Sequence, residues 1–101
     1  MLVGLVLAET RNVYGFVFGL GGATGSFREI RVTDMNTGFV HWVDGLNGGY
    51  LGLGGIRWFK NNLTVGHGYA VDVYSNGKGV RWTAFYLPSG RGDFKAPDVR
   101  F

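Results

Sequence analysis

The chain has 101 residues, 46% of them hydrophobic and 17% charged, a balance that is typical of one globular domain and excludes a disordered chain. It contains no cysteine, which excludes disulfide bonds and thiolate metal sites. The formal net charge of +3 comes from scattered Lys and Arg residues, so no basic stripe indicates a nucleic-acid surface.

Strands are predicted along the whole chain, because the 19 glycines interrupt every helical pattern and β-branched and aromatic residues dominate the rest. Residues 1–8 are apolar, without the basic residues that begin a signal peptide, and Glu9 follows directly. We interpret this run as the first strand and expect a protein made without an export signal. The predicted strands are 2–8, 13–18, 27–33, 39–43, 50–59, 69–74 and 80–87.

Two turn sequences predict hairpins. Asp34, Asn36 and Gly38 suit a tight turn between strands 27–33 and 39–43, because Asp and Asn bond to nearby backbone and Gly accepts a positive φ.

The pair Asn76-Gly77 favours a second hairpin, between strands 69–74 and 80–87. Alternation around this turn predicts one buried and one wet face. We expect the buried face to contain Val71, Val73, Val80 and Trp82.

After Pro88 the chain becomes polar, with two isolated aromatic residues, Phe94 and Phe101. We therefore expect a sandwich domain of residues 1–88, followed by an extended C-terminal arm of residues 89–101. On such an arm the two Phe side chains would be exposed unless they found an apolar partner.

The most specific motif lies just before strand 69–74. Leu63, Gly66 and Tyr69 have the spacing of a tyrosine corner, in which the Tyr ring is buried and its hydroxyl bonds to backbone a few residues upstream. With about seven short strands, the chain resembles the fibronectin type III domains and related immunoglobulin-like proteins. The resemblance implies an all-β, immunoglobulin-like sandwich of antiparallel strands, but no particular function.

No pattern indicates a catalytic or cofactor site. A zinc site would need both histidines, His41 and His67, with a carboxylate such as Asp44 or Asp72, and structural roles for the histidines are favoured. The serines lack a nucleophile elbow and an assignable base. We predict a protein that is not an enzyme and has no cofactor.

Aromatic residues provide the main binding signals. Residues 14–18 and 39–42 resemble the two aromatic strands of cold-shock domains, on which bases stack, although a place in the core is favoured for them. Sugar rings could stack on aromatic side chains of a wet face. The candidates for this role are Trp42, Trp58, Tyr74 and Tyr86.

Two short motifs are interpreted as chance. Arg91-Gly92-Asp93 spells the integrin-binding tripeptide, but it follows the last predicted strand. A glycosylation sequon begins at Asn62, which we interpret as a turn residue.

Three hypotheses of function follow. The first is a non-catalytic assembly module, a virion accessory protein of the capsid decoration or cement type, whose Phe94 and Phe101 contact a capsid shell or other copies of itself. The second is a carbohydrate-binding or adhesion module, and the third, least favoured, is single-stranded nucleic-acid binding. We expect no membrane partner, and a location in the virion or the cytoplasm.

Overall fold

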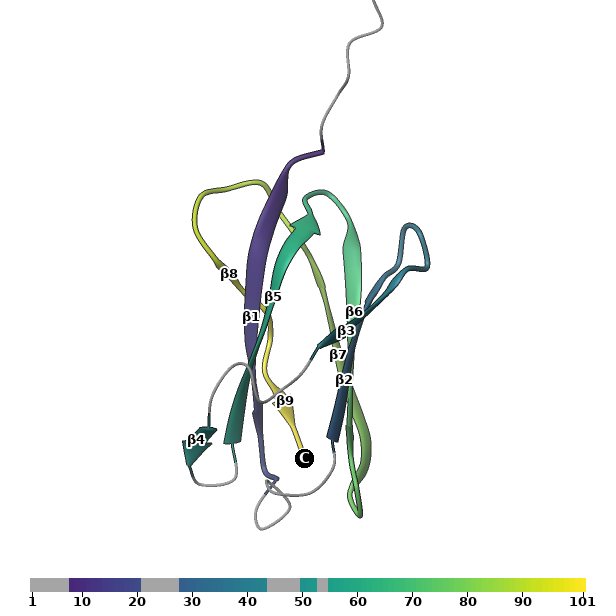
Figure 1. The fold of residues 1–101 in the computed structure, drawn as a ribbon, viewed down its shortest axis with the longest axis vertical. Coiled ribbons are helices and arrows are strands. Elements are labelled where there is room, and N and C mark those ends of the chain that lie inside the picture. The colour runs from purple at the N-terminus through teal and green to yellow at the C-terminus, as the bar shows by residue number, and fades with distance from the viewer. Residues whose placement is uncertain (1–7, 21–27, 44–49, 53–54) are drawn as a thin grey trace, which may run out of the picture.

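A computed structural model describes residues 8–20, 28–43, 50–52 and 55–101. These residues are all-β, and their strands form two sheets that pack face to face (Figure 1). Sheet A contains β1 (Thr10–Phe18), β4 (Tyr50–Gly52), β5 (Gly55–Thr64), β8 (Phe94–Lys95) and β9 (Val99–Arg100). Sheet B contains β2 (Arg28–Asp34), β3 (Val40–Val43), β6 (Gly68–Ser75) and β7 (Gly79–Tyr86).

Neighbouring strands pair antiparallel in both sheets, except along one side of β1. In sheet A, β5 lies between β4 and β1, and both contacts are antiparallel. In sheet B, the order is β3-β2-β6-β7, and every pair of neighbours is antiparallel. The exception is the other side of β1, where β8 and β9 pair with it in parallel.

Period-two alternation along the strands builds the core between the sheets. In β1, Val13 and Val17 are buried, whereas Tyr14 and Phe16 lie half-buried on the opposite face. The largest buried side chain is that of Trp58, in β5. Other core residues from both sheets include Ile30, Val32, Ile56, Leu63, Tyr69, Val71, Val73 and Leu87.

Most predicted strands match those of the structure. The predicted segments 13–18, 27–33, 39–43, 69–74 and 80–87 agree within a few residues with β1, β2, β3, β6 and β7. Predicted strand 50–59 is instead divided between β4 and β5. Predicted strand 2–8 lies outside the described residues except for Ala8, which is in no strand.

The β6–β7 hairpin has a different register from the one expected. Ser75 pairs with Gly79, and Trp82 therefore lies opposite Asp72. Trp82 is 70% exposed and Val80 49% exposed on the outer face of sheet B. The prediction that these two residues are buried with the valines of β6 is wrong, because a shift of one residue moves every side chain to the other face.

The C-terminal segment is part of sheet A, and the prediction of a separate arm is corrected. Residues 94–101 contribute β8 and β9, and the Ala96 N–H donates to the Tyr14 carbonyl oxygen at 2.8 Å. Phe94 and Phe101 pack against the core instead of being free for a partner. The edge of β1 explains this outcome, since its unpaired backbone groups gain partners from the tail.

Candidate functional site

One row of side chains crosses the outer face of sheet B. Arg31 lies opposite Trp42 on one side and opposite Asp72 on the other, and Asp72 in turn lies opposite Trp82. The two tryptophans thus stand on the first and last strands of the sheet, with a positive and a negative side chain between them. Because neighbouring strands are about 4.8 Å apart, the two Trp backbones are separated by about 14 Å.

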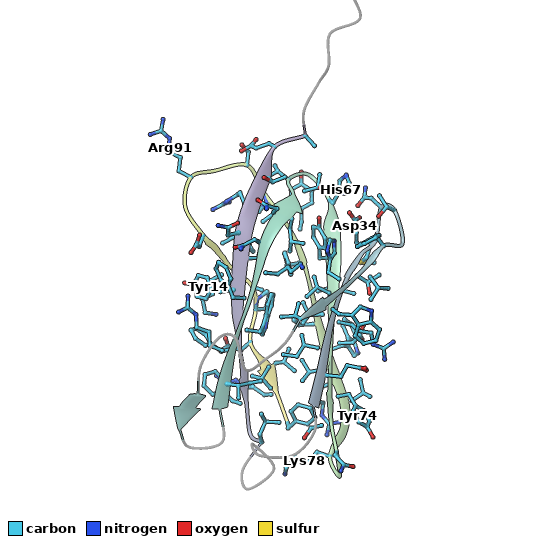
Figure 2. The ribbon with its side chains drawn as sticks, in the orientation of Figure 1. Tyr14, Asp34, His67, Tyr74, Lys78 and Arg91 are labelled. Carbon is cyan, nitrogen blue, oxygen red and sulfur yellow. The ribbon has the colours of Figure 1, made fainter. Side chains whose placement is uncertain are left out.

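Aromatic side chains on this face are accessible. Trp42 is 59% exposed, and the Arg31 guanidinium lies over its ring, 5.4 Å from the centroid. Arg31 Nε also lies 3.6 Å from Glu29 Oε2. Tyr74 projects outward on the same side of the molecule (Figure 2). We define the aromatic face by its exposed or half-exposed members Arg31, Trp42, Asp72, Tyr74, Val80, Trp82 and Tyr86.

The candidate stacking residues divide into two groups. Trp42, Tyr74 and Tyr86 are exposed on the aromatic face, whereas Trp58 is fully buried and cannot meet a ligand. Trp82 is the accessible tryptophan that the sequence analysis missed. A second glycine, Gly79, was the available signal, because it also has a positive φ and pairs with Ser75, which leaves a three-residue loop at residues 76–78.

A second row of aromatic residues lies on the outer face of sheet A. Tyr14, Phe16 and Phe18 alternate along β1, and Tyr14 projects away from the sandwich (Figure 2). A cation lies over each ring, with ring-centroid distances of 4.8 Å from Arg57 to Tyr14, 5.4 Å from Lys95 to Phe16 and 4.7 Å from Arg100 to Phe18. Segments 14–18 and 39–42 belong to different sheets, so the two aromatic segments do not form one platform.

The predicted corner has the geometry of the motif. The Tyr69 ring is buried, and the Thr64 N–H donates to its hydroxyl oxygen at 2.7 Å. Gly66 has a φ of 88°, which favours glycine at this turn, and the Leu63 side chain is buried in the core. Burial raises the pKa of the Tyr69 hydroxyl. These residues fix the chain before β6 and serve structure.

His67, in the turn before β6, and Asp34, the last residue of β2, form a polar contact. His67 Nδ1 lies 2.7 Å from Asp34 Oδ2, and the two side chains point toward each other (Figure 2). The other carboxylate oxygen accepts the Asn36 N–H at 2.8 Å. Burial by itself raises the pKa of Asp34, but the hydrogen bonds from His67 and Asn36 outweigh it and lower this pKa below 3.8.

The histidines and carboxylates do not gather into a metal site among the residues that the structure describes. No group of three potential ligands is present there, and Asp44 lies outside this part of the chain. His41 lies on β3, where burial and the charge of Lys60 lower its pKa.

The loop before β8 is held by Arg11. The Arg11 guanidinium donates to the backbone carbonyls of Pro88 at 2.9 Å and of Gly92 at 3.2 Å. Arg91 projects from this loop into solvent (Figure 2). An open polar pocket of about 310 Å³ lies between the loop and the paired ends of β1 and β5. Its lining residues are Thr10, Arg11, Asn12, Asn62, Gly90, Gly92 and Asp93.

Within the described part of the chain, no helix is long and apolar enough to cross a membrane. Comparison with known proteins shows no relative: no family model matches the chain, and neither a curated protein nor a solved structure matches it.

Proposed function

We propose that this domain is a non-catalytic assembly module that acts through protein–protein contacts, with the aromatic face as its contact surface. The observation that carries the proposal is the row in which Trp42 and Trp82, 59% and 70% exposed, flank Arg31 and Asp72. Large exposed apolar side chains grouped on one face of a domain mark interaction sites.

The composition of the face favours a protein partner. Trp, Tyr and Arg supply most hot spots of protein interfaces, and Lys is depleted in them. The aromatic face contains these three residue types, and none of the four strands of sheet B contains a lysine, since Lys78 lies in the turn before β7 (Figure 2). Arg31 and Asp72 would supply polar contacts that fix the orientation of the partner.

The biological setting that we propose is the surface of a larger protein shell, such as a virion. The tail does not support this proposal, because Phe94 and Phe101 pack against the core of their own chain. We therefore assign the contact with the shell to the aromatic face and not to Phe94 and Phe101 of the tail.

We further infer that the sandwich is of the immunoglobulin-like kind. Support comes from the strand orders β4-β5-β1 and β3-β2-β6-β7 together with the buried Tyr69 corner. In this comparison β1 takes the place of the second strand of a constant-type immunoglobulin domain. The first strand of such a domain pairs with the free side of the second, and here β8 and β9 pair with that side of β1.

Site-specific photo-crosslinking in the organism that encodes the protein tests the proposed contact surface. A photoreactive phenylalanine analogue replaces Trp82, and the matched control places it at Phe39, which is 62% exposed but lies outside the aromatic face. We expect one discrete cross-linked protein from position 82, lost when Trp42 is also changed to Ala. Equal products from both positions, or none from position 82, would refute the proposal.

A carbohydrate ligand is the second candidate, favoured by the spacing of the row. Trp42 and Trp82 stand on strands about 14 Å apart, with Arg31 and Asp72 between them. Their indoles could stack on two rings of one sugar chain while the charged groups bond to its hydroxyls. Tryptophan fluorescence during titration with a broad polysaccharide panel tests this function. A saturable change that is lost in Trp42→Ala and Trp82→Ala supports it, and an unchanged spectrum across the panel counts against it.

A further inference from the structure

Strand β7 is an unusually open edge of the sandwich. The opposite edge of sheet B, β3, has 4 residues, and β4 at an edge of sheet A has 3 residues and an irregular register. By contrast, β7 has 8 residues, and all of them pair with β6 without a shift. In the part of the chain that the structure describes, no strand pairs with the other side of β7.

The sequence of β7 carries only one of the usual protections of an edge, the inward-pointing charge of Arg81, which lies over the Phe101 ring. Natural edge strands are made short, or carry charged side chains, an inward-pointing charge, Pro or a bulge, to prevent pairing with another chain. Strand β7 reads Gly-Val-Arg-Trp-Thr-Ala-Phe-Tyr, with Arg81 as its single charged residue and no proline. It is therefore a regular template for a further strand.

Hydrogen bonds to β6 show which backbone groups of β7 point outward. The Leu87 N–H donates to the His67 carbonyl oxygen at 3.0 Å, so the backbone of Leu87 faces the β6 side. The direction alternates along a strand in an antiparallel ladder. The N–H and C=O groups that face the free edge are therefore those of Val80, Trp82, Ala84 and Tyr86.

We propose that β7 pairs antiparallel with β7 of a second copy, about a twofold axis at Thr83. This register sets Trp82 opposite Ala84 of the partner copy and Val80 opposite Tyr86 of the partner copy. It is the register in which every outward N–H and C=O of the strand finds a partner. The two sheets then continue into each other, with both aromatic faces on the same side.

The side chains of β7 are complementary to themselves in this register. The large indole of Trp82 lies opposite the small methyl group of Ala84, and the β-branched Val80 lies opposite an aromatic ring. Both are favourable cross-strand pairs. Arg81 lies opposite the uncharged Phe85 of the partner copy, so this register places no like charges opposite each other. An axis at Arg81 would instead place two like charges opposite each other. The partner is therefore a second copy of this chain, and the proposal rests on the edge of sheet B, independently of any ligand of its face.

Cysteine cross-linking tests both the pairing and its register. The chain has no cysteine, so Thr83→Cys introduces a single thiol on the proposed axis. Directly opposed residues of such a non-hydrogen-bonded pair have Cα atoms about 4.5 Å apart, within the range of disulfides. Arg81→Cys is the matched control, because its two copies would lie about 13 Å apart along the strands.

Mild oxidation should convert Thr83→Cys to a covalent dimer and leave Arg81→Cys monomeric on non-reducing gels. Equal cross-linking of both variants would overturn the proposed register. If neither variant cross-links, the dimer is refuted, and any strand that pairs with β7 must come from a different protein or from another part of this chain.

Light scattering over a concentration series supplies the second test. Wild type should change from monomer to dimer as concentration rises. Ala84→Pro removes one outward N–H from each copy without removing a bond to β6, and we expect it to raise the dissociation constant at least about tenfold. Ala84→Ser keeps the N–H and should dimerise like wild type. A wild-type chain that stays monomeric at the highest concentration, or a folded Ala84→Pro that dimerises equally well, would disprove the pairing.

Discussion

His67 Nδ1 lies 2.7 Å from Asp34 Oδ2, and this contact joins the turn before β6 to the end of β2, where the turn to β3 begins. A carboxylate can only accept, so Nδ1 carries the proton of this bond. The Asn36 side-chain oxygen reinforces the junction by accepting the Gly68 N–H at 2.9 Å. The two turns are thus held together at one end of sheet B.

Stability should decrease in acid because of Asp34. Its pKa is lower in the folded chain than the ordinary value of 3.8, so the unfolded chain binds more protons between the two values. The stabilisation is therefore complete above the unfolded value and is lost as the pH falls through the folded value. Urea unfolding of wild type and Asp34→Asn from neutral pH to pH about 2 measures it. We expect a shallower acid loss in Asp34→Asn, and parallel curves would contradict the role of this carboxyl group.

The hydroxyl of Tyr69 should contribute measurably to stability. In Tyr69→Phe the ring stays buried, but the Thr64 N–H loses its acceptor at 2.7 Å. An unpaired buried donor costs about 1–3 kcal/mol, and this one is partly buried, so the free energy of unfolding should fall by about 1 kcal/mol or more. Tyr86→Phe is the control, because its hydroxyl belongs to a side chain that is 63% exposed. A change of about 0.5 kcal/mol or less is expected there, and equal losses in both variants would argue against the corner.

Local patterns were sufficient to predict β1, β2, β3, β6 and β7 and the geometry of the Tyr69 corner, since alternation and turn residues are read within a few positions. The pairing of β8 and β9 with β1 was not predictable in this way. Each of these strands has 2 residues, too few to show a period, and their partner is far away in sequence.

Only part of the candidate site was predictable from the sequence, because the side on which a Trp lies also depends on contacts beyond its own strand. Trp58 and Trp82 exchange their expected positions, one buried and one exposed. The position of Trp82 depends on the number of residues in one turn, and a difference of one residue reverses the face. The burial of Trp58 depends on Gly15, which lies opposite it on β1 and leaves room for the indole.

Removal of the tail should unfold the domain instead of releasing a soluble core. A chain that ends at Leu87 loses the buried side chains of Ala96 and Val99 and the packed rings of Phe94 and Phe101. Full burial of a Val or Phe side chain is worth about 1.5–3 kcal/mol, and the two partly buried rings contribute a share of it. With the lost pairing to β1, this is a large part of the total stability of a small domain. Thermal unfolding followed by circular dichroism should show no cooperative transition. A truncated chain as stable as the full chain would show that the tail is dispensable.

The contact between Gly15 and Trp58 predicts a severe effect of a single methyl group. A Cβ at Gly15 would lie 2.5 Å from Trp58 Nε1 and 2.6 Å from Cε2, and the indole is fully buried. Gly15→Ala should therefore destabilise the fold by about 1–3 kcal/mol through overpacking. Gly68→Ala is the matched control, because a Cβ there meets no atom within 4 Å.

The smaller ring of Trp58→Phe should relieve this clash, so a double-mutant cycle by chemical denaturation separates the contact from a general loss of strand stability. We expect Gly15→Ala to cost less in the Trp58→Phe background than in wild type. An identical cost in both backgrounds would show that the methyl group acts on the backbone of β1 and not on the indole.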